Sequence, residues 1–334
     1  MTTSHGPIPQ FEPGTVVDGR YRIQAVIAAG GMGTVYRASP LSGDDSVALK
    51  VLHPDLRQIP SAVARFKREA WAVERLAHPN ILRLLDFRES EAGLLYLVSE
   101  LLDGMTLGEH LFRHGPMRPA NAVRVASEVL AALEEVHAAG FVHRDLKPDN
   151  IFITRGTPFG VKVLDFGLVK LLEASDGLGR LTKTGTIGGT PRYTSPENAL
   201  SQPIDGRSDL YSVGLLIYEM VTGQPPFEGE TPVELALAHI EQRAPTMVLA
   251  QHPLPEPLVE LVRQCLQKDP ADRPQSSAKL RETLLAIAAE PIVALASPAT
   301  PEHQTTASPW RGAGYLLWSA AAIVALVALA WLLR

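Results

Sequence analysis

One group of polar residues constrains the fold of this chain more than any other feature. Residues 143–150 have the sequence HRDLKPDN, and fifteen positions after Asn150 the triplet DFG begins at Asp165. The apolar runs 151–153 and 161–164 lie between them and predict a β-hairpin that brings Asn150 and Asp165 together. Mg²⁺ prefers oxygen ligands and needs few from the protein when phosphates supply the rest. The spacing therefore predicts a metal-nucleotide site, with Asp145 left as a candidate base and Lys147 as a candidate partner of phosphate.

The two motifs resemble those of the protein kinase family, whose catalytic loop has the pattern H-R-D-x-x-x-x-N and whose metal loop is D-F-G. Either motif alone is often a plain turn, but the pair at this spacing argues against that alternative. The resemblance implies that Asp145 accepts or orients the proton of a substrate hydroxyl and that Lys147 stabilises the transferring phosphoryl group. It implies that Asn150 and Asp165 hold Mg²⁺, with Mn²⁺ as the alternative metal. A lysine two places after the catalytic aspartate is typical of members that modify serine or threonine.

A glycine cluster near the start of the chain predicts the nucleotide-binding turn. Residues 21–38 alternate apolar and polar side chains around GGMG at 30–33, which indicates a strand, a turn and a second strand. Such a cluster alone more often marks a plain hairpin. However, the next strand, VALK at 47–50, is similar to the family's V-A-I-K, and the resemblance implies that Lys50 pairs with the α- and β-phosphates of ATP. One departure is Ala28, which stands where the family has the first glycine of the loop.

The rest of the small lobe follows the same resemblance. Residues 65–77 have helical periodicity, and Glu69 lies where the family's helix carries the glutamate that pairs with the strand lysine. Residues 81–87 and 94–98 indicate two further strands, so five strands and one helix are expected. Residues 99–104 form the expected hinge. The predicted ATP-binding residues are Ile27, Ala28, Ala29, Gly30, Gly31, Met32, Gly33, Thr34, Val35, Ala48, Lys50, Glu69, Glu100 and Leu102, the last two through their backbone.

Ser99 stands at the position before the hinge where the family commonly has a larger side chain. We expect it to leave a pocket behind the adenine ring. The alternative is a buried serine that is bonded to the nearby backbone.

The larger lobe is expected to be helical. Residues 107–112 and 120–139 indicate helices, the second ending at Gly140. Asp209 is a helix N-cap candidate, and by resemblance it also props the catalytic loop. Glu197, in the triplet SPE that matches the family's A-P-E, is expected to pair with Arg273.

The segment between DFG and SPE contains the sequence LTKTGT at 181–186. Composition alone favours an unmodified loop, but similar bacterial kinases phosphorylate a T-x-T-G sequence here. We therefore expect phosphorylation at Thr182, Thr184 and, as a minor site, Thr186, by a second copy of the chain. Thr190 resembles the threonine that contacts the catalytic aspartate.

The two ends of the chain differ. Residues 1–20 form a Pro- and Gly-containing extension, residues 289–311 a linker rich in Pro, Ala, Ser and Thr, and residues 312–333 an uncharged run long enough to cross a bilayer. A buried core helix is the alternative for that run. We expect a single-pass anchor in the cell membrane with the lipid bilayer as a partner and the catalytic domain in the cytoplasm. The net charge of −5 gives no basic footprint for nucleic acid, and the single cysteine is consistent with a reducing compartment.

The expected fold is therefore α+β and two-lobed, with a kinase domain at 21–288, divided into a β-rich N-lobe at 21–101 and a helical C-lobe at 103–288. The expected activity is ATP-dependent phosphoryl transfer to protein serine or threonine in membrane-associated signalling. A catalytically inactive scaffold at the membrane is the first alternative, although Lys50, Asp145 and Asp165 are all present. A small-molecule kinase is the second.

Overall fold

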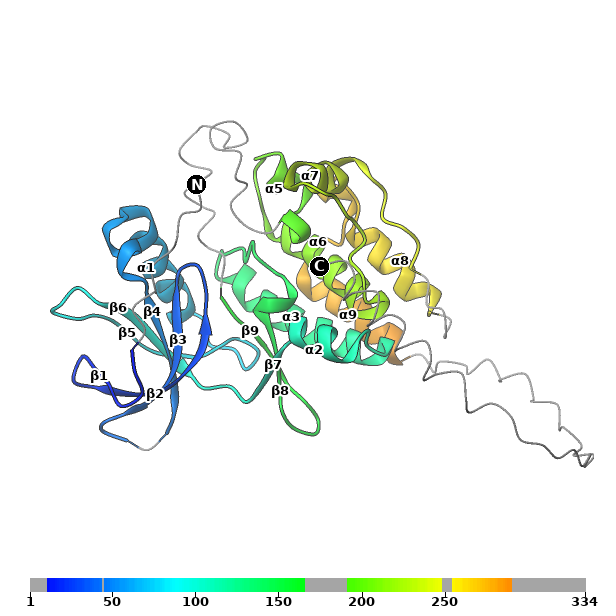
Figure 1. Cartoon of the computed structure of the whole chain (residues 1–334). Coiled ribbons are helices and arrows are strands. Elements are labelled where there is room, and N and C mark those ends of the chain that lie inside the picture. The colour runs from blue at the N-terminus through cyan, green and yellow to red at the C-terminus, as the bar shows by residue number, and fades with distance from the viewer. Residues whose placement is uncertain (1–10, 44, 166–190, 248–253, 290–334) are drawn as a thin grey trace, which may run out of the picture. The chain divides into compact units, whose positions relative to one another are not determined.

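The computed structural model describes residues 11–43, 45–165, 191–247 and 254–289. These residues form a smaller lobe built on an antiparallel sheet and a larger, mainly helical lobe (Figure 1). The predicted α+β, two-lobed fold is confirmed. Residues 182–186, 290–311 and 312–333, with the predictions made for them, lie outside the described residues.

The smaller lobe is a six-stranded antiparallel sheet with the order β1-β2-β3-β4-β6-β5. Its elements are β1 (Val16–Val17), β2 (Tyr21–Ala29), β3 (Gly33–Pro40), β4 (Val47–Leu52), η1 (Pro54–Gln58), α1 (Pro60–Glu74), β5 (Leu84–Glu89) and β6 (Leu95–Glu100). Alternate residues pack on opposite faces, as expected for strands. Tyr36, Leu49 and Val51 belong to the cluster on one face, whereas Leu52 and Leu97 pack with Phe66 of α1 on the other.

The smaller lobe differs from the predictions in its number of strands and at several element boundaries. The sheet has six strands rather than five, because the two-residue strand β1 is too short to show alternation in the sequence. Helix α1 begins at Pro60 rather than residue 65, since proline fits the first turn of a helix. Ile81 lies outside β5 and instead forms a parallel bridge with Val163 of the larger lobe.

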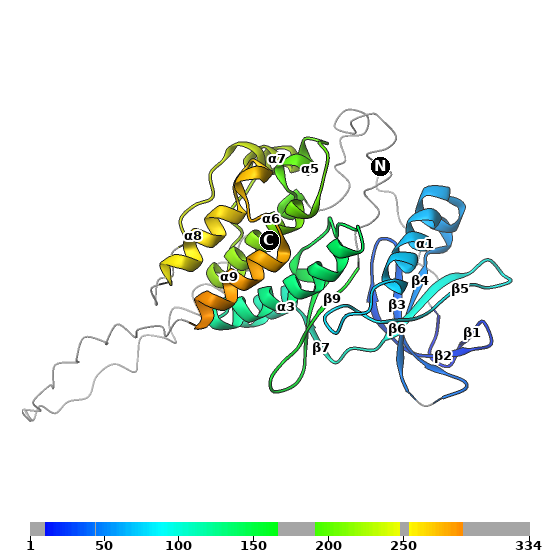
Figure 2. The same ribbon diagram turned by 180° about the vertical axis from the view of Figure 1, so that it is seen from behind.

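The larger lobe packs its helices around a buried central helix, α6. Its elements are β7 (Gly104–Thr106), α2 (Leu107–His114), α3 (Pro119–Ala138), η2 (Pro148–Asn150), β8 (Ile151–Thr154), β9 (Val161–Val163), η4 (Pro191–Tyr193), α5 (Pro196–Ala199), α6 (Gly206–Thr222), α7 (Pro232–Glu241), α8 (Glu256–Cys265), η5 (Pro270–Asp272) and α9 (Ser277–Ala289). Apolar side chains of α3, α6, α8 and α9 form one core. Figure 2 gives the reverse view, with α3 beside α9.

The hairpin predicted at the centre of the chain is confirmed. Strand β8 pairs with β9 in an antiparallel register that sets Ile151 opposite Val163. The N–H of Leu164 then donates to the carbonyl of Asn150 at 2.8 Å. Asn150 and Asp165 therefore lie at the same end of the hairpin.

Within the described ranges, no helix combines the length and apolar character needed to span a bilayer. Residues 312–333 lie outside these ranges, so the expected anchor stays a prediction.

Candidate functional site

The loop before the hairpin is held in place by one buried carboxylate. Asp209, 1% exposed in the first turn of α6, accepts the backbone N–H groups of His143 at 2.8 Å and Arg144 at 2.9 Å. Helix α6 is capped instead by Asp205, whose carboxylate accepts the N–H of Arg207. The N-cap prediction for Asp209 is therefore wrong, because the helix begins earlier in the chain and leaves Asp209 to bind the loop. Arg144 has a φ of 66°, so these bonds hold the loop in a backbone conformation that residues other than glycine rarely adopt.

His143 ties the loop to the hairpin. Its Nδ1 accepts the N–H of Asp145 at 3.3 Å, so the ring proton lies on Nε2, which is 3.1 Å from the carbonyl of Leu164. Burial lowers the pKa of His143, although the carboxylate of Asp209 opposes this. A neutral ring fits both contacts.

Three of the predicted catalytic residues meet on this loop. Lys147 Nζ lies 3.1 Å from Asp145 Oδ2. The side-chain amide of Asn150 donates to the carbonyl of Asp145 at 2.8 Å and to its Oδ2 at 3.1 Å. These two bonds fix the Asn150 nitrogen toward Asp145, and the amide oxygen consequently points the other way.

The fourth predicted catalytic residue, Asp165, lies just after the hairpin and contacts the smaller lobe. Asp165 Oδ1 accepts a hydrogen bond from Lys50 Nζ of β4 at 2.9 Å. The carboxylate is 52% exposed, and its backbone has a φ of 31°. Glu69, the partner predicted for Lys50, lies on α1, but its side chain lies outside the described part of the structure.

The glycine turn lies between β2 and β3. A Cβ at Gly33 would lie 2.2 Å from the carbonyl oxygen of Val51, so only glycine fits there. Ala28, the departure from the family pattern, lies in β2 opposite Val35 and does not have a positive φ. Its methyl group therefore causes no backbone strain. Ala48 pairs with Ser99 of β6, which places the strand lysine and the hinge on adjacent strands.

The hinge is joined to the hairpin by a pair that the sequence analysis missed. Glu100 Oε1 accepts from Lys162 Nζ of β9 at 2.6 Å and from the N–H of Arg83 at 2.9 Å. The available signal was a lysine between the buried residues Val161 and Val163. Leu102, the other hinge residue, is half-buried.

Ser99 is 4% exposed and borders a cavity of about 20 Å³ together with Ala70, Val73 and Asp165. Its hydroxyl lies 3.3 Å from the carbonyl of Glu100. The alternative interpretation, a buried serine bonded to nearby backbone, is confirmed. The small cavity is about the size of one water molecule, and its use as a pocket behind the adenine ring stays a prediction.

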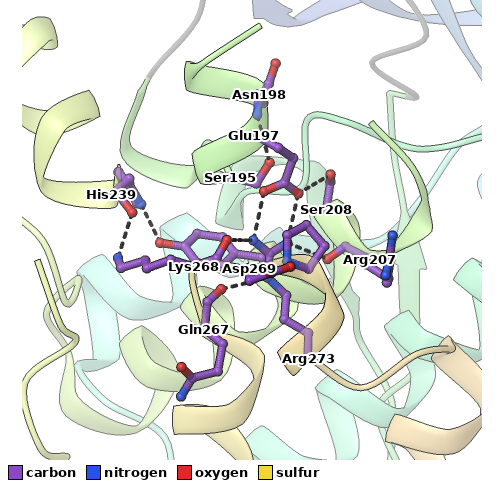
Figure 3. A network of polar contacts seen from close by, with 12 residues as sticks. Ser195, Glu197, Asn198, Arg207, Ser208, His239, Gln267, Lys268, Asp269 and Arg273 are labelled. Atoms are coloured by element: carbon purple, nitrogen blue, oxygen red, sulfur yellow. Dashed lines mark hydrogen bonds and ion pairs between the residues drawn. The ribbon is translucent and has the colours of Figure 1, made fainter. Parts of the chain in front are cut away.

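A buried ion pair holds the triplet SPE at 195–197. Arg273 donates to both oxygens of Glu197, each at 2.8 Å, and the two side chains are 0% and 4% exposed. Ser208 of α6 also donates to Glu197 (Figure 3). Burial alone would raise the pKa of Glu197, but the hydrogen bonds from Arg273 and Ser208 bring it below its usual value. The predicted pair is confirmed, and Thr190, just before this segment, lies outside the described residues.

The comparisons with known proteins decide the family. The model of the protein kinase domain matches residues 21–285. The chain belongs to the protein kinase family. Among curated relatives, the kinase domain is 42% identical over 278 residues to "Serine/threonine-protein kinase pkn3" of Myxococcus xanthus, covering 82% of this chain and 51% of that protein. It is 39% identical over 272 residues to "Serine/threonine-protein kinase PknB" of Mycobacterium tuberculosis, covering 80% of this chain and 43% of that protein. The chain therefore spans about half the length of these relatives or less.

Solved structures show the same fold. The kinase domain matches the crystal structure of the Mycobacterium tuberculosis PknI kinase domain with a TM-score of 0.61 at 23% identity, covering 84% of this chain and 100% of that chain. It also matches Rad53 in complex with AMP-PNP with a TM-score of 0.64 at 28% identity, covering 79% of this chain and 64% of that chain.

Proposed function

We propose that this chain is an ATP-dependent serine/threonine protein kinase. The observation that carries the proposal is the convergence of Asp145, Lys147 and Asn150 on one loop beside the Lys50–Asp165 pair. Kinase catalysis depends almost entirely on positioning and charge stabilisation, and this cluster provides both. The names of the curated relatives agree with it.

The residues present fit a nucleotide-bound Mg²⁺, with Mn²⁺ as the alternative. The amide oxygen of Asn150 is turned away from Asp145, and the exposed carboxylate of Asp165 lies at the same end of the hairpin. Both are oxygen donors of the type that Mg²⁺ prefers. When bound, the ion would neutralise charge on the β- and γ-phosphates.

The chain's own residues divide the remaining work. Asp145 would hold and orient the hydroxyl of a substrate serine or threonine, and Lys147, beside it, would balance charge on the γ-phosphoryl group. Lys50 would pair with the α- and β-phosphates. The backbone of the glycine turn and of Glu100 and Leu102 would bind the phosphates and the adenine.

A transfer assay separates this function from its rivals. Wild type and Asp145→Asn are incubated with γ-labelled ATP and either a basic protein or a pool of small hydroxylated and amine compounds. Label on serine and threonine of the protein, lost in the variant, supports the proposal. Label only on small molecules would indicate a small-molecule kinase, and no label from either form would indicate an inactive scaffold.

We further propose that the kinase is activated by phosphorylation of its own loop by a second copy of the chain. The motivation is the sequence LTKTGT at 181–186, since phosphate adds charge and acceptor oxygens that basic groups such as Arg144 can order. The variant Thr182→Ala with Thr184→Ala is expected to lose at least about tenfold in activity, which corresponds to an increase of about 1.4 kcal/mol in the activation barrier. Equal activity of the double variant and wild type would rule the proposal out.

The third part of the proposal is a membrane anchor at residues 312–333, with the kinase domain on the cytoplasmic side, where ATP is available. The run is uncharged and long enough to cross the bilayer. Full-length protein should stay in the membrane pellet after alkaline carbonate and high salt, and a chain ending at residue 311 should not. Release of the full-length chain by either wash would contradict the anchor.

A further inference from the structure

The glycine turn is braced by a histidine from the neighbouring strand. His53, the first residue after β4, has its ring Nε2 2.8 Å from the carbonyl of Gly30. Its backbone N–H donates to the carbonyl of Met32 at 3.0 Å. A carbonyl oxygen only accepts, so the Nε2 proton is on the ring and is donated to Gly30.

The His53 ring replaces a hydrogen bond that the turn would otherwise make with itself. A two-residue hairpin turn is normally closed by two backbone bonds between its flanking residues. Here Gly30 N–H donates to Gly33 O at 3.0 Å, but the Gly30 carbonyl accepts from His53 instead. The register of β3 on β4 pairs Gly33 with Leu52, and the bond between Met32 and His53 makes this a non-hydrogen-bonded pair. The N–H of Gly33 therefore makes no hydrogen bond to β4.

The side from which His53 bonds the Gly30 carbonyl determines where the turn presents its N–H groups. Successive residues of β4 face opposite sides of the sheet, so His53 faces the side of Val51, away from Lys50. The ring borders a cavity of about 200 Å³ with Val51 and Tyr36, which belong to the cluster on that face. In a trans peptide the C=O and N–H groups point in opposite directions. A Gly30 carbonyl drawn toward His53 consequently turns the N–H of Gly31 toward the face that carries Lys50.

We propose that His53 positions the glycine turn for phosphate binding. It withdraws a carbonyl oxygen that would repel a phosphate oxygen, and it directs the N–H of Gly31 toward the phosphates beside Lys50. His53 acts through the Gly30–Gly31 peptide and is a positioning residue rather than a catalytic one. The inference rests on the proposed function, because it assigns the phosphate end of a nucleotide to this turn.

The test compares ligands with and without phosphates. His53→Leu removes the donor and keeps apolar bulk next to the cavity, whereas His53→Gln keeps a terminal N–H donor with a reach similar to that of Nε2. Dissociation constants for ADP with Mg²⁺ and for adenosine are measured by calorimetry on the full chain. His53→Leu, which loses the hydrogen bond to the Gly30 carbonyl, should bind ADP about fivefold more weakly, in line with one hydrogen bond, and bind adenosine as wild type does. His53→Gln should restore the affinity for ADP.

Failure of His53→Gln to restore the affinity for ADP would contradict the hydrogen bond as the cause. Equal weakening of ADP and adenosine by His53→Leu, or no change in either, would overturn the positioning role. If His53→Leu does not fold, His53→Asn serves in its place, since its amide is one carbon shorter than that of Gln and does not reach Gly30. His114→Leu, on α2, is the matched control and should leave both constants as in wild type. A wild-type chain that binds neither ligand would contradict the proposed function itself.

Discussion

Single residues of the candidate site take their roles from partners that are far away in the sequence. The orientation of the Asn150 amide is fixed by Asp145, and the conformation of the catalytic loop by Asp209, 66 positions beyond His143. Each contact restricts a group that would otherwise rotate freely. Such restriction holds catalytic groups near their working geometry and reduces the entropy lost on substrate binding.

Ser99 gives a prediction at this scale. The cavity beside it is about 20 Å³, and a methionine in its place would fill that space and project toward the predicted adenine site. An inhibitor with a bulky aromatic group on a purine-like ring should therefore bind Ser99→Met at least about tenfold more weakly than wild type, an overpacking cost of about 1.4 kcal/mol. Ser99→Ala is the control and should keep the wild-type inhibition constant. Equal inhibition of wild type and Ser99→Met would show that no usable space exists behind the adenine.

The sequence was informative where chemistry dictates residue type and spacing together. The approach of Asn150 to Asp165 could be predicted because the apolar runs at 151–153 and 161–164 indicate a hairpin, and the structure contains that hairpin. His53 could not, because its contact with Gly30 depends on the register of β3 on β4. Asp209 was half predicted, since its support of the loop was expected but its N-cap role was wrong.

At the scale of elements, α6 frames the site. Within one turn at its start, Asp209 holds the catalytic loop while Ser208 and Arg207 contact the Glu197–Arg273 pair. The helix is buried along most of its length, so it cannot shift without disturbing the core. Polar residues in the first turn of α6 thus fix both the catalytic loop and the Glu197–Arg273 pair to this helix.

His239 of α7 gives the prediction for this scale. It is fully buried, accepts a hydrogen bond from Tyr211 of α6 at Nδ1, and lies near Lys268 (Figure 3). Burial, with Lys268 adding to it, lowers the pKa of His239 from 6.5 to about 4. The unfolded chain therefore takes up a proton between pH 6.5 and 4 that the folded chain does not, and stability falls as the pH decreases through this window.

The measurement is the free energy of unfolding in urea between about pH 7 and 4 for wild type and His239→Asn. The wild-type value should fall more steeply than that of the variant, by up to about 1.4 kcal/mol per pH unit. A difference between the two that does not change with pH would show that His239 titrates alike in both states.

Element boundaries were less predictable than element types. The long helix α3 and the hairpin of β8 and β9 could be predicted from their apolar patterns, whereas β1 consists of two residues paired with β2. Val17 of β1 packs in the same apolar cluster as Tyr36 of β3, against which Phe11 also packs, with ring centroids 5.7 Å apart. No local pattern encodes such a contact.

At the scale of the molecule, the two lobes are connected through a few polar contacts as well as the hinge. Lys50 of the smaller lobe binds Asp165, and Glu100 at the hinge binds Lys162 of β9. Both contacts end on the hairpin that carries Asn150. A displacement of the smaller lobe would therefore disturb contacts of the hairpin that carries Asn150, and the proposed loop phosphorylation would act on catalysis by this route.

The most direct test of the account is the turnover number of wild type and Asp145→Asn on a serine- or threonine-containing protein, with the affinity for ADP measured alongside. Wild type, once activated, should turn over at about 1 to 100 per second. The variant should lose at least about 100-fold, as expected for removal of a group that orients and accepts the hydroxyl proton, while its affinity for ADP changes less than about twofold. A variant that keeps more than about a third of the wild-type turnover would contradict the assignment of Asp145 and, with it, the proposed catalytic site.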